Sequence, residues 1–319
     1  MKLLKKIKLN YNLKLLKDYC SNQKFEDAYD LIQTVKKKDK IDFYLLLKNS
    51  QELLTNLPTN FYKKKIIWTI SYDISDVSYI NKFLDHYLKN NLNLSFNIEN
   101  FANLLNNYFT NLDAKSQVKD IVFNDYLTQS NLYQNIVLLD SDKEYLFLNT
   151  CASFFETSKK TYFIQPNLTF CYFYIINNPS ELTLRFKQKH NTIEAAYDEL
   201  FNFSDQQYLG KEQENKTFKV YEYRKNFNVN VKSWTDENVI NSFKGKIISY
   251  EKLKDDTQSV LLEILYHLKQ YGMPIKIDIN NIKNFIENNK LSEKIDGDLS
   301  NNERKFLNKN LDPELNIHY

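Results

Sequence analysis

The residues of this chain that are best placed to do chemistry lie in a short loop after the apolar run 66–71. Ser75 and Ser78 supply hydroxyls there, and Asp73 and Asp76 supply carboxylates. Apolar residues at helical spacing follow, so the sequence predicts a strand, a tight loop and a helix. This layout can hold a phosphate at the helix N-terminus. The loop has no Gly, Lys or Arg, and its carboxylates would repel a phosphate, which indicates an anion site without its binding chemistry.

The elements that would position this loop belong to an α/β fold. Strand-like and helix-like segments alternate through residues 61–319, which favours one domain with a parallel sheet flanked by helices. The predicted strands are Ile66–Ile70, Tyr145–Leu148, Phe170–Ile176, Lys219–Tyr223 and Lys246–Ser249. The predicted helices are Val77–Leu88, Phe101–Tyr108, Glu181–Gln188, Ile193–Phe201, Val229–Trp234, Thr257–Tyr271, Ile279–Asn288 and Asn301–Asn310. The stretch Asn90–Asn100 is interpreted as a loop.

Residues 1–60 are predicted to form a helical extension. Phe25, Tyr29 and Ile32 share one face at helical spacing. The stretch Asn22–Lys37 faintly resembles one helix of a tetratricopeptide-type hairpin, but one partial repeat cannot form a solenoid. A helical cap on the main domain is therefore favoured. The apolar face could otherwise contact a protein partner, because an exposed stripe of this size is unusual in a monomer.

Composition excludes several classes of site. The chain has 4 Gly, none after a plausible first strand, so it contains no Gly-rich phosphate loop. The 3 Cys and 4 His are scattered without metal-ligand spacing, and no metal site is expected. A formal net charge of +3 over 319 residues argues against a dedicated nucleic-acid binder.

Nothing in the sequence predicts export or membrane insertion. Residues 1–16 are basic but lack the continuous apolar core of a signal peptide. The longest apolar run, near Phe170–Ile176, is too short to span a bilayer. A reducing, cytoplasmic location fits these features and the scattered cysteines.

A family resemblance becomes visible toward the C-terminus. Lys-Ser-Trp at 232–234 precedes Lys-Ile-Ile-Ser-Tyr-Glu-Lys-Leu at 246–253, and a long amphipathic helix follows. This order resembles the sulfotransferase family, whose members carry a Trp, a strand, Arg-Tyr-Glu-Asp-Leu and then a helix. Ser71–Tyr79, Phe147–Cys151 and Tyr174–Pro179 resemble the family's Ser-Tyr-Pro-Lys-Ser-Gly loop, its Phe-X-Lys-Thr-His strand end and its strand ending in Arg-Asp-Pro. The resemblance covers about residues 65–319.

The resemblance implies a P-loop NTPase-like α/β fold and 3′-phosphoadenosine 5′-phosphosulfate as the donor of a sulfuryl group to a hydroxyl or amine. In the family, a loop Lys and hydroxyls hold the 5′-phosphosulfate, an Arg and a Ser hold the 3′-phosphate, and a His acts as the base. The corresponding donor-binding positions here are Ile74, Ser75, Asp76, Ser78, Tyr79, Asn177 and Arg185. The corresponding catalytic positions are Asn149, Thr150 and Cys151.

The charged residues of the family pattern are therefore missing, and two classes of function remain open. The favoured one is a sulfotransferase-like pseudoenzyme that binds a partner or acts as a scaffold. The alternative is a divergent active sulfotransferase in which Arg185 and nearby lysines replace the usual cations; a related transferase with another donor is a third.

For Arg185 a solvated helix face is favoured over a phosphate contact. Cys151 is expected to be a small buried hydrophobe, and Ser75 and Ser78 turn and cap hydroxyls.

Overall fold

A computed structural model describes the protein over most of its length. The described residues are 2–55, 57–58, 61–62, 64–92, 98–100, 123–154, 162–202, 207–208, 221–222, 224–291 and 297–318. The predicted helix at 101–108 lies outside them. The division into a 1–60 extension and a 61–319 domain stays a prediction.

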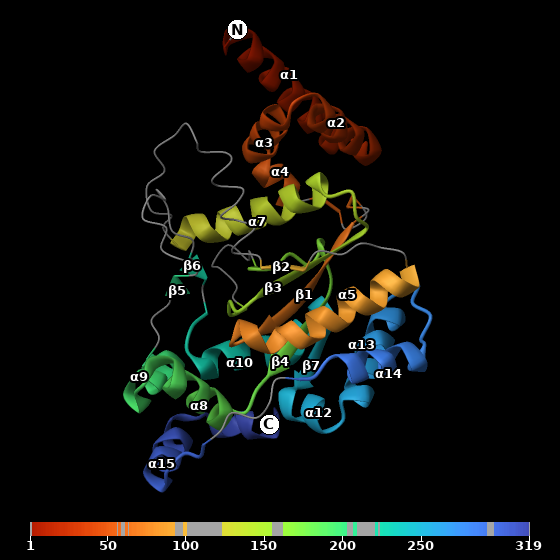
Figure 1. The fold of residues 1–319 in the computed structure, drawn as a ribbon. Helices are drawn as coiled ribbons and strands as arrows, with labels where there is room; N and C mark the ends of the chain where they lie inside the picture. The colour runs from red at the N-terminus through yellow and green to blue at the C-terminus, as the bar shows by residue number, and fades with distance from the viewer. Residues whose placement is uncertain are drawn as a thin grey trace.

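A five-stranded parallel sheet forms the centre of the fold (Figure 1). Its order is β2 (Ile98–Asn100), β3 (Tyr145–Thr150), β1 (Lys65–Ser71), β4 (Thr169–Ile176) and β7 (Gly245–Ser249). Both central strands, β1 and β4, are almost wholly buried, as expected for strands covered on both faces. The predicted α/β class and four of the five predicted strands are confirmed.

Two strand predictions are wrong. Ile98–Asn100 pairs with β3 as an edge strand, although this Asn-rich stretch was expected to be a loop. Of the predicted strand 219–223 the structure describes β6 (Tyr221–Glu222), which pairs antiparallel with β5 (Gln207–Tyr208) and does not belong to the central parallel sheet. The periodicity of such short segments does not determine which strand they pair with, because that depends on tertiary contacts.

The two faces of the sheet carry different helices because successive side chains of a strand point to opposite faces. Ile66, Trp68 and Ile70 of β1 pack in one apolar cluster with α7 (Phe123–Asp140), α8 (Pro179–His190) and α10 (Phe227–Thr235). Ile67 packs in the other cluster with α5 (Ser78–Leu92), α13 (Thr257–Gln270) and α14 (Ile279–Asn288). β1 therefore lies at the centre of both layers and positions the loop that follows it.

The first four helices form a layer beside α7, in which the second, third and fourth contact α7 and the first packs on the second and third (Figure 1). They are α1 (Lys2–Ser21), α2 (Phe25–Lys38), α3 (Lys40–Asn49) and α4 (Gln51–Thr55). Leu16, Ile32 and Phe43 belong to the same apolar cluster as Trp68 of the sheet. The Lys36 ammonium donates to the carbonyl of Leu139 at 3.3 Å, at the C-terminal end of α7, where the helix dipole favours a cation. The helices thus share a core with the sheet, as the cap interpretation expects.

The remaining described helices and helical turns are short, and four of them begin at a side-chain cap. They are α9 (Ile193–Tyr197), the π-helical turn Asp198–Asn202, α11 (Glu237–Phe243), α12 (Tyr250–Asp255), α15 (Asn301–Asn310) and the 3₁₀ turn Pro313–His318. Both α14 and α15 have the predicted bounds. Asp278 caps α14 through two backbone N–H groups, and Ser300 and Glu303 form a capping box at α15. Trp234 of α10 is fully buried, as expected.

Candidate functional site

The candidate site lies at the carboxyl ends of β1 and β4. After β1 the chain continues to β2 and β3 on one side of the sheet, whereas after β4 it continues to β7 on the other side. Ligands of open α/β sheets bind in the crevice at such a reversal. The loop after β1 and the residues after β4 therefore form the part of the sheet edge where a ligand site is expected.

The loop after β1 is organised by Asp73. Its Oδ1 accepts a hydrogen bond from the Ser75 N–H at 3.1 Å, and this bond caps the 3₁₀ turn Ile74–Val77 that leads into α5. The Asp76 N–H donates to the Asp73 carbonyl at 3.0 Å. Asp73 is thus a helix cap of the expected kind. Asp76 is turned inward instead, and only 1% of its side chain is exposed.

Arg185 joins α8, the helix that follows β4, to the loop after β1. It lies on α8, whose start is fixed by Pro179 and by the Asn178 side chain. Its Nη1 lies 2.6 Å from Asp76 Oδ1, 2.8 Å from Asp73 Oδ2 and 3.0 Å from Ser75 Oγ. The expectation that Arg185 belongs to a solvated helix face is wrong, because two carboxylates in the loop after β1 attract its guanidinium.

Asn177 completes the cluster at the end of β4. Its Nδ2 donates to Asp76 Oδ1 at 3.1 Å. We call Asp73, Ser75, Asp76, Asn177 and Arg185 the carboxyl-edge cluster. Four of the five, Ser75, Asp76, Asn177 and Arg185, stand at donor-binding positions of the family pattern in the sequence analysis. With two carboxylates and one guanidinium, the cluster carries a formal charge of about −1 when every group is ionised.

Burial determines the ionisation of this cluster. Burial raises the pKa of Asp76 to about 6, although the charge of Arg185 and the hydrogen bonds from Arg185 and Asn177 oppose this shift. For Asp73 burial acts in the same direction, but hydrogen bonds from Arg185 and Ser75 outweigh it and hold its pKa below the ordinary value. The two carboxylates raise the pKa of Arg185 despite its own burial. Asp76 is therefore the group of the cluster that titrates nearest neutral pH.

Two oxygens of the cluster are buried without a hydrogen-bond partner in the described part of the chain. They are Asp76 Oδ2 and Asn177 Oδ1. An unpaired buried carboxylate oxygen disfavours the charged form, which agrees with the raised pKa of Asp76.

The other predicted donor-binding residues lie at the start of α5 and do not join the cluster. Ser78 is exposed at the first position of α5. Tyr79 is buried, its hydroxyl donates to the Asn289 carbonyl at 3.3 Å, and its ring packs edge-on against Phe285. Tyr79 thus serves the packing between α5 and α14.

The predicted catalytic positions end β3. Asn149 and Thr150 pair in register with Thr69 and Ile70 of β1. Thr150 Oγ1 accepts a hydrogen bond from the Ala152 N–H at 3.1 Å. Cys151 is buried, as expected, with 3% of its surface exposed. The end of β3 is thus held by a hydrogen bond between a side chain and the backbone, and Cys151 offers little surface to a substrate.

A second charged cluster near this edge was missed in the sequence. Glu199 accepts hydrogen bonds from Arg224 Nη2 at 3.1 Å, from Lys189 at 3.3 Å and from His190. The guanidinium of Arg224 lies 4.2 Å from the centre of the Tyr72 ring, and the Tyr72 hydroxyl donates to the Glu199 carbonyl. The sequence signal that could have indicated Arg224 was the scarcity of Arg, because the chain has only three. The structure shows that Arg224 is buried. It fixes Tyr72, next to Asp73.

Strand β4 is also tied to β7. Glu251 Oε1 accepts a hydrogen bond from the Asn178 N–H at 2.8 Å, and Ser249 donates to Glu251 Oε2 at 3.2 Å. The Glu of the Ser-Tyr-Glu segment thus holds the end of β4 beside the carboxyl-edge cluster.

Comparison with known proteins returned no relative: neither a protein-family model nor a curated protein matches the chain. Among the described residues, no group of three or more His, Cys, Asp or Glu side chains is arranged to hold a metal ion. No helix in the described ranges is long and apolar enough to cross a membrane.

Proposed function

We propose that this protein is a degenerate relative of the sulfotransferases that binds a partner and no longer transfers a sulfuryl group. The observation that carries the proposal is the bonding of Arg185 to Asp73 and Asp76 at the carboxyl edge of the sheet. This crevice is where an α/β fold of this kind would hold the phosphates of a donor nucleotide. Here two carboxylates of the chain itself, those of Asp73 and Asp76, are paired with the Arg185 guanidinium that such a phosphate would need.

The fold and the sequence motifs support the family part of the proposal. A central parallel strand, a tight loop and a helix occur in the order that the family requires. The motif positions lie at the ends of β1, β3 and β4, along one edge of the sheet. A fold supports many activities, however, so the activity must be argued from the residues in the site.

The residues in the site argue against donor binding. A phosphate at the loop after β1 would have to displace both carboxylates from Arg185, and each charge-assisted hydrogen bond is worth about 1.5–3 kcal/mol. Micromolar affinity corresponds to only about 8 kcal/mol in total. Competition by two internal carboxylates therefore removes most of the binding energy that a nucleotide could gain there.

The residues at the end of β3 argue against catalysis. The family's base position is held by Cys151, which is buried, and its Lys position by Asn149, which carries no charge. Loss of a general base alone costs on the order of 10²–10⁴ in rate. A binding or scaffold role requires neither group.

One observation supports the alternative, a divergent active sulfotransferase. Arg185 does lie at the crevice, with the Ser75 hydroxyl beside it, so both groups could contact a phosphate if the carboxylates were protonated or displaced. The same geometry would serve a transferase with another donor.

Isothermal titration calorimetry with adenosine 3′,5′-bisphosphate tests the proposal. We expect no binding at sub-millimolar concentration, and no sulfuryl transfer from 3′-phosphoadenosine 5′-phosphosulfate to phenolic or amine acceptors. A low-micromolar dissociation constant would refute the pseudoenzyme and favour the active transferase. In that case Arg185→Ala should abolish the binding, whereas Arg304→Ala, which changes an exposed Arg on α15, should leave it unchanged.

A further inference from the structure

Helix α1 has two apolar faces, and the body of the protein covers only one of them. Leu16 is fully buried, and Leu9 and Leu13 pack on the same apolar core. On the opposite side, Ile7 and Tyr11 are 56% and 64% exposed. These two residues are one turn apart and therefore adjacent on the helix surface. The outer face of α1 is thus largely exposed at Ile7 and Tyr11.

The charge of α1 differs from that of the rest of the chain. The helix holds six lysines and a single acidic residue, Asp18, so its formal charge is +5, whereas the whole chain is only +3. All other residues together therefore carry −2. Figure 1 shows α1 at the opposite end of the molecule from α8, away from the carboxyl-edge cluster.

The lysines flank the exposed apolar residues. Lys14 follows Ile7 and Tyr11 at positions i+7 and i+3, so it lies on the same face. Lys6 is exposed beside Ile7, whereas Lys8 is engaged by Asp42 of α3 at 3.1 Å. Lysines beside exposed apolar residues favour contact with an anionic surface, because each lysine near an anionic leaflet is attracted to its headgroups.

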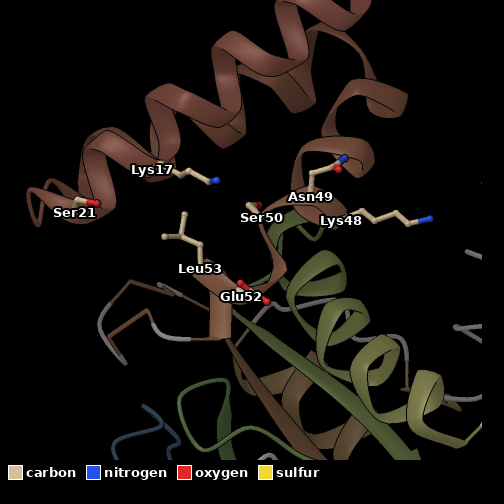
Figure 2. A pocket seen from close by; sticks show the side chains of 7 residues that line it. All are labelled: Lys17, Ser21, Lys48, Asn49, Ser50, Glu52 and Leu53. Carbon is tan, nitrogen blue, oxygen red and sulfur yellow. The ribbon is translucent and has the colours of Figure 1, made fainter.

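A cleft of about 680 Å³ lies at the C-terminal end of α1, between this helix and the turn from α3 to α4 (Figure 2). Lys17 and Ser21 line it from α1, and Lys48, Asn49 and Glu52 line it from the other side. Figure 2 shows the Lys17 side chain extending from α1 toward Asn49. The two lysines outnumber the one carboxylate, so the cleft has the size and the charge to hold the phosphate of a lipid headgroup.

We propose that the outer face of α1 binds an anionic phospholipid surface, with Ile7 and Tyr11 in the interfacial region and Lys14, Lys17 and Lys48 on the headgroups. The contact is peripheral, since no described helix could span the bilayer. It does not depend on the carboxyl-edge cluster or on the function proposed for it.

Vesicle co-sedimentation of the full chain tests this. We expect binding to vesicles of equal parts phosphatidylcholine and phosphatidylserine at low salt, loss of binding at high salt, and none to phosphatidylcholine alone. The variant K14E/K17E/K48E should bind at least about a hundredfold more weakly, because each lysine near an anionic leaflet contributes about 1 kcal/mol. Tyr11→Ala should weaken binding severalfold without changing the charge.

The matched control is K269E/K305E/K309E, which makes the same change in net charge at exposed lysines of α13 and α15. It should bind the anionic vesicles as the wild type does. Equal loss in both triple variants, or no wild-type binding to anionic vesicles, would overturn the proposal. Binding of soluble poly-glutamate in the absence of vesicle binding would also overturn it and assign this face to an acidic protein.

Discussion

Asp76 and Arg185 form the closest ion pair at the candidate site, with Asp76 Oδ1 2.6 Å from Arg185 Nη1. The two residues are far apart in the sequence, yet they meet where the loop after β1 faces α8. The aspartate is buried, whereas 23% of the Arg185 side chain is exposed. In this pair a carboxylate of the chain itself binds the guanidinium that could otherwise contact an anionic ligand. Four predictions follow from the pair and from the apolar core of the protein.

Removal of the two carboxylates should restore anion binding. In the variant D73N/D76N, Arg185 loses both of its charged partners, while an Asn at position 73 can still cap the 3₁₀ turn. We expect the variant to bind adenosine 3′,5′-bisphosphate or pyrophosphate at least about tenfold more tightly than the wild type, a difference of about 1.4 kcal/mol. Calorimetry measures this. The control D85N/D142N, at other carboxylates, should match the wild type; equal affinities for all three proteins would show that no anion pocket underlies the cluster.

Loss of Arg185 should destabilise the fold. Arg185→Ala leaves the buried Asp76 carboxylate without its counter-ion, and removal of one partner of a buried pair costs about 3 kcal/mol or more. Arg304→Ala is the control, because Arg304 pairs with an exposed Asp298 and such surface pairs contribute less than about 1 kcal/mol. Urea unfolding at neutral pH measures both. A similar small loss for the two variants would mean that the cluster is well solvated.

The stability of the fold should depend on the pH through Asp76. Its folded-state pKa, about 6, lies above that of the unfolded chain, so the folded state binds more protons between about pH 4 and pH 6. The contribution of Asp76 to the free energy of unfolding therefore falls as the pH rises through this window and is constant above it. The opposite shift of Asp73 acts at lower pH, where protonation removes stability.

Asp76→Asn isolates this contribution. The difference in free energy of unfolding between wild type and D76N should change between pH 4 and pH 6 and remain flat between pH 7 and pH 8, as followed by urea unfolding at each pH. A difference that does not vary with pH would contradict the raised pKa.

The N-terminal helices should unfold together with the sheet. Phe43 of α3 is fully buried in the cluster that also contains Trp68 of β1, so Phe43→Ala should cost about 3–5 kcal/mol and shift the whole transition. Leu45→Ala, on the same helix but 38% exposed, should cost less than about 1 kcal/mol. Circular dichroism and Trp fluorescence should report one shared transition in each variant. Two separate transitions, with only the first moved by Phe43→Ala, would show that the helices form an independent module.

The sequence determined the elements whose signals are local. The apolar, β-branched run before Ser71 predicted β1, and the helices at 279–288 and 301–310 were predicted to the residue, because Asp278 and Ser300 supply side-chain caps that depend only on their neighbours. The placement of Ser75, Asn149 and Asn177 near one sheet edge followed as well, since parallel strands end on the same side.

Only the tertiary structure decided what Arg185 and Asp76 do. Helical periodicity left Arg185 as one more polar residue of α8, and the loop sequence indicated only that the Asp76 carboxylate would repel a phosphate. Their contact depends on the distance between α8 and the loop after β1, which is set by packing across the sheet and has no signature within either segment. The same reason hid Arg224, whose burial against Tyr72 and Glu199 joins three separate parts of the chain. Local patterns fix the elements, but the low dielectric of the packed interior fixes which charges must pair.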